Sequence, residues 1–195
     1  MVRPPTRVPT ERDIPEQSDV SILRRLAGGE SGALGDLYDR HQARVRRFLV
    51  RATSDAEDVD DLVHVTFLTA AKIAARYDGR LSCHPWLIGI AAQLLRRRRR
   101  AFSRLFDVVS SLARAPSPAM DPGQAMLTRS DVQWALARLS PPKRIAVVMA
   151  EVEGLTCAEI AEALRIPIGT VWTRLHAARR ELRQLLQDEG EGRGP

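Results

Sequence analysis

Polar and basic side chains gather near the C-terminus of the sequence in a pattern suited to contacts with nucleic acid. Residues 155–182 read LTCAEIAEALRIPIGTVWTRLHAARREL. Thr156 and Glu159 form a capping box, which predicts the start of a short helix. The segment 165–167 then predicts a tight turn, and Thr170 is expected to cap a second, longer helix. A short helix, a turn and a longer helix have the layout of a helix-turn-helix.

In a helix-turn-helix the second helix enters the major groove, where its first residues contact base edges and later arginines contact phosphates. Trp172 faces away from the apolar side of this helix, so it has no expected role in a core. A hairpin of two helices that merely pack together is the structural alternative, and Glu159 and Glu162 are unfavourable near phosphates. The predicted DNA-contacting residues are Thr170, Trp172, Thr173, Arg174, His176, Arg179 and Arg180.

A second basic feature is the run of arginines from Arg96 to Arg100, which follows an apolar helical stripe ending at Leu95. At about 100° per residue, consecutive helical positions sweep round the axis, so these arginines cannot share one face. We therefore predict that the run projects beyond its domain towards nucleic acid. The whole chain carries a net charge of +6, from 30 basic and 24 acidic residues, which favours a polyanionic partner.

The sequence shows none of the residue patterns on which enzyme catalysis depends. Paired carboxylates, a nucleophile with its base and a glycine-rich phosphate loop are not recognisable. Cys83 and Cys157 are far apart, which excludes a disulfide framework and favours a reducing cytoplasm. We interpret Cys83 and His84 as part of a packed loop, because no further metal ligands lie nearby in the sequence. The sequence thus predicts no enzyme, no cofactor and no metal.

The elements that must position these residues are helical throughout, since no segment sustains the alternation of a strand. The sequence predicts an all-α fold of two small domains. A four-helix domain spans 19–101, and the helix-turn-helix domain spans 130–187. A flexible linker over 102–129, with a short helix near its start, is expected to join them. Residues 1–18 are expected to form a disordered leader and residues 188–195 a frayed tail.

No apolar run approaches the roughly 18 residues that a membrane-spanning helix needs, and the N-terminus lacks the apolar stretch of a secretory signal. We therefore expect no membrane insertion and a cytoplasmic location. Trp86 stands beside Leu87 at the start of an apolar stripe, and we expect it to belong to the core.

Three stretches of the sequence resemble bacterial RNA polymerase sigma factors of the extracytoplasmic-function (ECF) type. LSPPKRIAVVMAEVEGLTCAEIAEALRIPIGTVWTRLHAARREL, residues 139–182, resembles their C-terminal promoter-recognising domain. DAEDVDDLVHVTFLTAAKI, residues 55–73, resembles the helix that binds core polymerase, and PWLIGIAAQLLRRRRR, residues 85–100, resembles the helix that melts promoters and recognises the minus-ten element. The resemblance implies a dissociable initiation factor whose two domains recognise the minus-ten and minus-thirty-five elements.

The resemblance also implies roles for single residues. Val65 stands where the family often has an acidic residue, Gln93 where it often has asparagine, and Trp172 where it usually has lysine or arginine. The resemblance implies core RNA polymerase, promoter DNA and an anti-sigma factor as partners, for a chain that is monomeric outside the polymerase complex. The implied polymerase-binding residues are Asp58, Asp60, Asp61, Leu62, His64 and Thr66, and the implied minus-ten and melting residues are Arg80, Ser82, His84, Gln93, Arg96, Arg97, Arg98, Arg99 and Arg100.

Two alternatives remain open at this point. A stand-alone helix-turn-helix regulator would bind duplex DNA tightly without polymerase, although the sequence shows no dimerisation helix or effector domain. A helical protein–protein module would use the arginine run on anionic lipid, which sedimentation with anionic vesicles tests.

Overall fold

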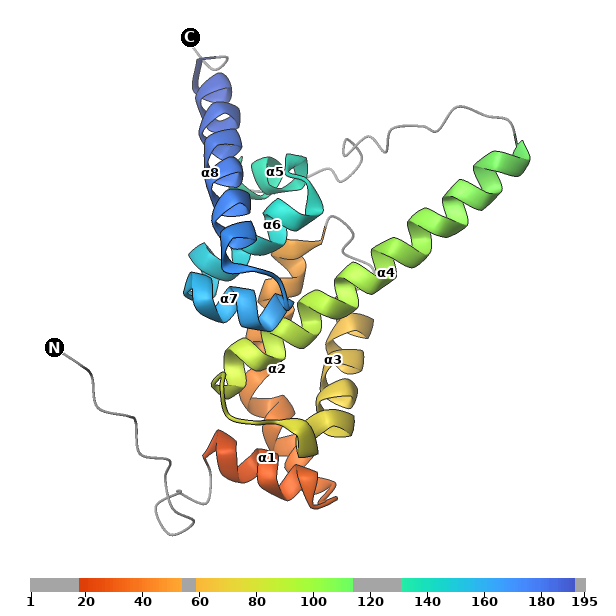
Figure 1. The fold of residues 1–195 in the computed structure, drawn as a ribbon, viewed down its shortest axis with the longest axis vertical. Coiled ribbons are helices and arrows are strands. Elements are labelled where there is room, and N and C mark those ends of the chain that lie inside the picture. Colours follow the sequence, from red (N-terminus) through yellow and green to blue (C-terminus); the bar gives the residue numbers. More distant parts are fainter. Residues whose placement is uncertain (1–17, 54–58, 114–130, 192–195) are drawn as a thin grey trace, which may run out of the picture.

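The computed structural model describes residues 18–53, 59–113 and 131–191, and every regular element within these ranges is a helix (Figure 1). The predicted all-α fold is therefore confirmed. Residues 1–17, most of the predicted leader, and 114–130, much of the predicted linker, lie outside the described residues. Within the described ranges no helix is both long and apolar enough to cross a membrane.

The N-terminal half consists of α1 (Asp19–Ala27), α2 (Gly32–Ala52), α3 (Val59–Ile73), a 3-10 turn η2 (Ala74–Arg76) and α4 (Cys83–Ala113). The Ser18 hydroxyl caps α1 by accepting a hydrogen bond from the Ser21 amide at 3.2 Å. Gly29, with φ of 88°, supplies the left-handed turn that leads into α2. The apolar stripes of these helices form a shared core, whose largest fully buried side chains include Ile22, Leu37, Phe48, Leu49 and Leu87.

Helix α4 is longer than the sequence pattern predicts. It continues past Arg100 to Ala113, through the first part of the range predicted as a linker, as one uninterrupted helix. Residues 101–113 contain neither glycine nor proline, so nothing in this stretch ends a helix. The C-terminal half of α4 extends away from the other helices (Figure 1).

The C-terminal half consists of α5 (Asp131–Arg138), α6 (Pro141–Val147), a π-helical turn η3 (Val148–Val152), α7 (Cys157–Leu164) and α8 (Ile168–Glu191). The predicted capping box at the start of α7 is present, with the Thr156 amide donating to Glu159 Oε2 at 2.8 Å. The prediction that Thr170 caps α8 is wrong. The helix begins two residues earlier, and the Thr170 amide donates to the Pro167 carbonyl at 2.9 Å.

The two halves of the chain pack against each other. The sequence predicts two domains connected through a linker, whereas in the structure α4 lies along α7 and α2 contacts η3. The buried apolar residues of both halves form one continuous cluster from Ile22 in α1 to Ala178 in α8. The packing partners of α4 therefore include the short first helix of the helix-turn-helix.

The capping box makes a testable contribution to stability. We expect Thr156→Ala to lower the free energy of unfolding by about 1 kcal/mol, because the Glu159 amide loses the Thr156 hydroxyl at 3.2 Å. In a domain of this size that change lowers Tm by roughly 2–4 °C in a thermal melt followed by circular dichroism. Ser31→Ala is the matched control, since Ser31 precedes α2 without a side-chain capping bond. Equal losses of Tm in the two variants would contradict this account.

Candidate nucleic-acid interface

The start of α8 presents several predicted DNA-contacting side chains to solvent. Trp172 is 58% exposed, as its position opposite the apolar face predicts. Thr173, His176 and Arg180 are also exposed, whereas Thr170 and Arg174 are half-buried. Ile168, which was not among the predicted residues, is 41% exposed beside them. An exposed tryptophan next to exposed polar groups is suited to a contact surface rather than a core.

The acidic residues of α7 do not all face the predicted DNA surface. Glu159 is held in the capping box, so its carboxylate is committed to the start of its own helix.

Arg165 ends α7 in the left-handed conformation, with φ of 53°, and turns the chain towards α8. Arg179 is engaged in an exposed ion pair within the chain, where its Nη2 donates to Glu151 Oε1 at 2.7 Å. A phosphate contact by Arg179 therefore competes with this ion pair.

The arginine run is spread around α4, as its consecutive positions require. Arg97, Arg98 and Arg100 are exposed, while Arg96 and Arg99 are half-buried. Burial lowers the pKa of Arg99 from its usual range. The pKa of Arg96 is lowered by burial and by the nearby charges of Arg100 and Arg174. The arginine run and Arg174 of α8 thus contribute to one region of positive potential.

The residues implied in minus-ten recognition divide into two groups. Arg80 and Ser82 are exposed in the loop before α4. Gln93 instead faces the C-terminal half, where its Nε2 donates to the Ala163 carbonyl at 2.9 Å. Arg96 donates to the Leu164 carbonyl at 3.4 Å. These carbonyls belong to the end of α7, so Gln93 and Arg96 cap a helix whose last carbonyls lack partners within the helix.

Helices α4 and α7 touch most closely at Gly89. A Cβ built on Gly89 would lie 3.0 Å from the Ala163 Cβ and 3.1 Å from the Ala163 carbonyl oxygen. These distances are shorter than ordinary carbon contacts, so a side chain at this position requires α7 to move. Glycine and alanine thus allow the two backbones to approach.

A buried pair of titratable groups adds to this contact. His84, at the start of α4, lies with Nε2 3.1 Å from Glu153 Oε2, and the Glu153 side chain is only 2% exposed. Glu153 follows η3, so the pair joins the two halves. His84 Nδ1 and Glu153 Oε1 are buried without a hydrogen-bond partner among the described residues. Separation of the halves would return both groups to water, which offsets part of the cost of opening.

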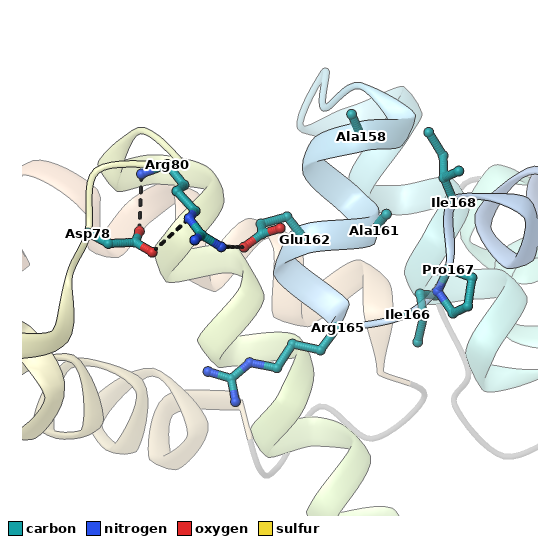
Figure 2. Close-up of a pocket in the computed structure, with 9 residues that line it drawn as sticks. All are labelled: Asp78, Arg80, Ala158, Ala161, Glu162, Arg165, Ile166, Pro167 and Ile168. Carbon is teal, nitrogen blue, oxygen red and sulfur yellow. Dashed lines mark hydrogen bonds and ion pairs between the residues drawn. The ribbon is translucent and has the colours of Figure 1, made fainter. Parts of the chain in front are cut away.

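A cleft of about 800 Å³ lies between the loop before α4 and the helix-turn-helix. Figure 2 shows Asp78, Arg80 and Glu162 reaching across it in a chain of polar contacts. Arg80 Nε lies 3.2 Å from Asp78 Oδ2, and Arg80 Nη1 lies 3.8 Å from Glu162 Oε1. Arg165 and Ile166 line the same cleft. The cleft thus brings a predicted minus-ten residue, Arg80, next to the turn of the helix-turn-helix.

Helix α3 carries the residues implied in polymerase binding. Asp60, Asp61 and His64 are exposed, and Asp58 lies outside the described residues. Leu62 and Thr66 are buried, so their side chains lie beneath the exposed face of α3, and their role in docking stays a prediction. The Thr66 hydroxyl donates to the Leu62 carbonyl at 2.6 Å within the core. The exposed apolar residues on this helix are instead Val65, at 37%, and Leu68, at 53% exposure.

Helical periodicity explains why some predicted residues of α3 are buried while other apolar residues are exposed. Leu62 and Thr66 are four residues apart and lie on the same side as the core residue Phe67, whereas Val65 and Leu68 share the opposite side with Asp61. The pattern therefore contained the signal that separates core from surface. A search for apolar residues outside the buried stripe would have found Leu68.

Two protein-family models match separate stretches of this chain. The family model for sigma-70 region 2 matches residues 37–105, and the model for sigma-70 region 4 matches residues 129–182. The RNA polymerase sigma factor CarQ of Myxococcus xanthus is 34% identical over 170 residues, covering 84% of this chain and 95% of the relative. The ECF RNA polymerase sigma factor SigL of Mycobacterium tuberculosis is 34% identical over 168 residues, covering 84% and 94%.

Solved structures share the fold. CnrH in complex with the cytosolic domain of CnrY is similar with a TM-score of 0.62 and 26% identity, covering 87% of this chain and 97% of that chain. The sigma factor RpoE in complex with the anti-sigma factor NepR, from Bartonella quintana, has a TM-score of 0.63 at 24% identity and covers 77% and 94%.

Proposed function

Because this chain belongs to the ECF RNA polymerase sigma factors, we propose that its exposed α3 face, the loop before α4 and the start of α8 perform the three contacts of promoter-specific initiation. The protein is a sigma factor that binds core RNA polymerase and directs transcription from particular promoters. Sigma factors are not catalytic enzymes in the usual sense, and the polymerase performs the chemistry. We place its action in the cytoplasm, where polymerase and promoter DNA are found.

The single observation that carries the residue assignment is the joint exposure of side chains on α3 and at the start of α8 within one helical frame. The exposed residues of α3 are Asp60, Asp61, His64, Val65 and Leu68. They form a mixed acidic and apolar strip, which is suited to a basic, amphipathic partner helix. The exposed residues at the start of α8 are Trp172, Thr173 and His176, which occupy the positions of base-contacting residues in the second helix of a helix-turn-helix.

The closed packing of α4 on α7 bears on how both promoter elements are engaged. Elements about 25 base pairs apart are separated by roughly 85 Å along the DNA axis. Helices in direct contact at Gly89 and Ala163 cannot lie on both elements at once. We therefore propose that promoter binding requires the two halves to separate, which frees Gln93 and Arg96 from the carbonyls of α7.

Reconstituted transcription tests the proposed function. Purified core polymerase and this protein, incubated with a genomic DNA library, should produce transcripts with defined starts that polymerase alone does not produce. Mapping those starts would reveal the two sequence elements and their spacing. Failure to bind core polymerase and failure to produce specific transcripts would together overturn the proposal. Tight binding to a palindromic duplex without polymerase would instead favour a stand-alone regulator.

We also propose an anti-sigma factor as a partner, since the similar CnrH and RpoE structures were solved with CnrY and with the anti-sigma factor NepR, respectively. The cleft between Arg80 and the end of α7 is lined by residues of both halves. A partner that holds this cleft would favour the closed arrangement and oppose the separation that promoter binding requires.

The exposed arginines of α4 should contribute a salt-dependent term to promoter binding. We expect replacement of Arg97, Arg98 and Arg100 with alanine to weaken holoenzyme binding to promoter DNA and to reduce the slope of log K against log salt. Three lost phosphate contacts change that slope by roughly 2–3. A filter-binding series at increasing salt measures it. Substitution of Arg24, Arg44 and Arg47, exposed on α1 and α2, is the matched control and should leave the slope unchanged.

An unchanged slope in the α4 variant would show that these arginines form only a solvated helix surface. A similar reduction in the control would show that overall charge, rather than position, determines the salt dependence.

A further inference from the structure

The N-terminal helices bring together three side chains of types that bind divalent metal ions. Asp19 begins α1, His41 lies in the middle of α2, and Cys83 begins α4. A carboxylate oxygen, an imidazole nitrogen and the cysteine Sγ of these residues all lie within 4.8 Å of one another. The residues are distant in sequence, and none belongs to the surfaces proposed for polymerase or DNA. The cluster therefore exists only because the helices pack as they do.

The cluster is enclosed on one side and open on the other. The His41 side chain is 6% exposed and that of Asp19 is 32% exposed, while Cys83 is 2% exposed. His41 Nε2 lies 3.1 Å from Asp19 Oδ1. Solvent therefore reaches the cluster past the carboxylate, and an ion could enter by the same route.

The second observation is that His41 is incompletely satisfied. Its Nδ1 is buried and has no hydrogen-bond partner among the described residues. Buried polar atoms nearly always have a partner, so an exception calls for an explanation. His41 also interrupts the otherwise apolar buried face of α2, where an aliphatic residue would pack at lower cost. An imidazole retained in this position, beside a thiol and a carboxylate, indicates a further ligand.

We propose that Asp19, His41 and Cys83 bind a zinc-like divalent ion. A thiolate, an imidazole and a carboxylate suit Zn²⁺, whereas Mg²⁺ and Ca²⁺ prefer oxygen ligands alone. At usual zinc bond lengths, ligands of a tetrahedral site lie about 3.4–3.8 Å apart, so a pair separated by 4.8 Å must close by about 1.4 Å at most. Three protein ligands leave the fourth position to water, on the side where Asp19 is exposed.

Two groups must change when the ion binds. Arg40 Nη1 donates to Asp19 Oδ1 at 2.9 Å, and its partly exposed side chain has room to turn into solvent. Burial raises the pKa of the Cys83 thiol to about 12, so the metal-free sulfur carries a proton. Coordination converts the thiol to a thiolate and releases that proton to solvent. The Asp19 carboxyl, whose pKa is lowered despite burial by its hydrogen bonds to Arg40 and His41, needs no such change.

The position of the site gives the ion a structural consequence. It would tie the first residue of α1 and the first residue of α4 to the centre of α2. The loop that carries Arg80 and Ser82 leads directly into Cys83, so this tie would fix one end of the loop. Loss of the ion would release this end of the loop.

Cobalt substitution tests the site directly in the full-length, metal-free protein. Titration with Co²⁺ should produce a thiolate-to-cobalt charge-transfer band that saturates at one equivalent and disappears when Zn²⁺ is added. Cys83→Ser should abolish the band, whereas Cys157→Ser, which removes the other cysteine, should leave it intact. Zn²⁺ should also raise the Tm of the wild-type and Cys157→Ser proteins but not that of Cys83→Ser.

Asp19→Asn is the variant least expected to disturb packing, because this side chain is partly exposed. It should retain the wild-type circular dichroism spectrum and weaken Co²⁺ binding by at least roughly tenfold. Absence of the band in wild-type protein, its loss in Cys157→Ser instead of Cys83→Ser, or equal Co²⁺ affinity of Asp19→Asn and wild type would each overturn the proposal.

Discussion

Replacement of Gly89 with valine is expected to shift the protein from its closed arrangement to an open one. A single Cβ at this position would already lie 3.0 Å from the Ala163 Cβ, and valine adds two further methyl groups. Overpacking of a close contact typically costs 1–3 kcal/mol, which changes the ratio of closed to open protein by about 5- to 150-fold. Valine is a better helix former than glycine, so α4 itself should not weaken.

Small-angle X-ray scattering measures this effect as an increased radius of gyration, with an unchanged far-ultraviolet circular dichroism spectrum. Gly35→Val is the matched control, because Gly35 lies in α2 and a Cβ built on it meets nothing within 4 Å. If Gly89→Val and Gly35→Val both scatter like the wild type while remaining folded, the contact at Ala163 does not hold the halves together.

Replacement of Leu68 with arginine is expected to lower the affinity for core RNA polymerase by about 30-fold or more. Leu68 is 53% exposed on α3, beside exposed Val65 and the carboxylate of Asp61. Truncation of an anchoring residue at an interface typically costs at least about 2 kcal/mol, which corresponds to this change. Arginine adds like-charge repulsion if the partner helix is basic, as the acidic residues of α3 imply.

A competition titration against a labelled wild-type protein, with purified core polymerase, measures the change. Val50→Arg is the matched control, since Val50 is 36% exposed on α2 and lies outside the proposed surface. Equal affinities of the Leu68→Arg and Val50→Arg proteins would place the docking surface elsewhere on the molecule. Circular dichroism spectra of both variants verify that neither substitution unfolds the chain.

Local signals in the sequence were sufficient to predict where several helices begin and end. The capping box at Thr156 marks a helix start that the structure confirms, and the proline after Ser140 and the glycines at 28 and 29 coincide with further helix ends. These signals act within one turn of backbone, so they do not depend on the rest of the fold. Trp172 was likewise assigned to the surface from its position relative to Val171 and Leu175, because periodicity alone separates the faces of a helix.

Contacts between distant segments were not predictable in the same way. No spacing rule indicates that the Gln93 amide meets the Ala163 carbonyl, or that His84 meets Glu153. The first pair depends on how α4 crosses α7 at Gly89 and Ala163, and the second on where the start of α4 meets the end of η3. The buried Arg144 is similar. It is 2% exposed, and its Nη2 donates to the Leu139 carbonyl at 3.1 Å, yet a basic residue early in a helix indicates a surface position.

The cluster around Cys83 was not predictable from the sequence. Cys83 and its neighbour His84 supply too few ligands by themselves, whereas the structure places Asp19 and His41 beside Cys83. Metal sites assembled from three helices leave no motif, since each helix supplies one residue. Only the packed arrangement reveals which side chains meet.

The unbroken length of α4 determines how efficiently the second domain finds its DNA element once the first is bound. From Leu95 to Ala113 the helix is a rigid arm of roughly 27 Å, while residues 114–130 reach at most about 60 Å when fully extended. A span of roughly 85 Å therefore uses nearly all of the available reach. Effective concentration falls to near zero once a tether cannot span its sites, so each base pair added between the elements should reduce avidity steeply.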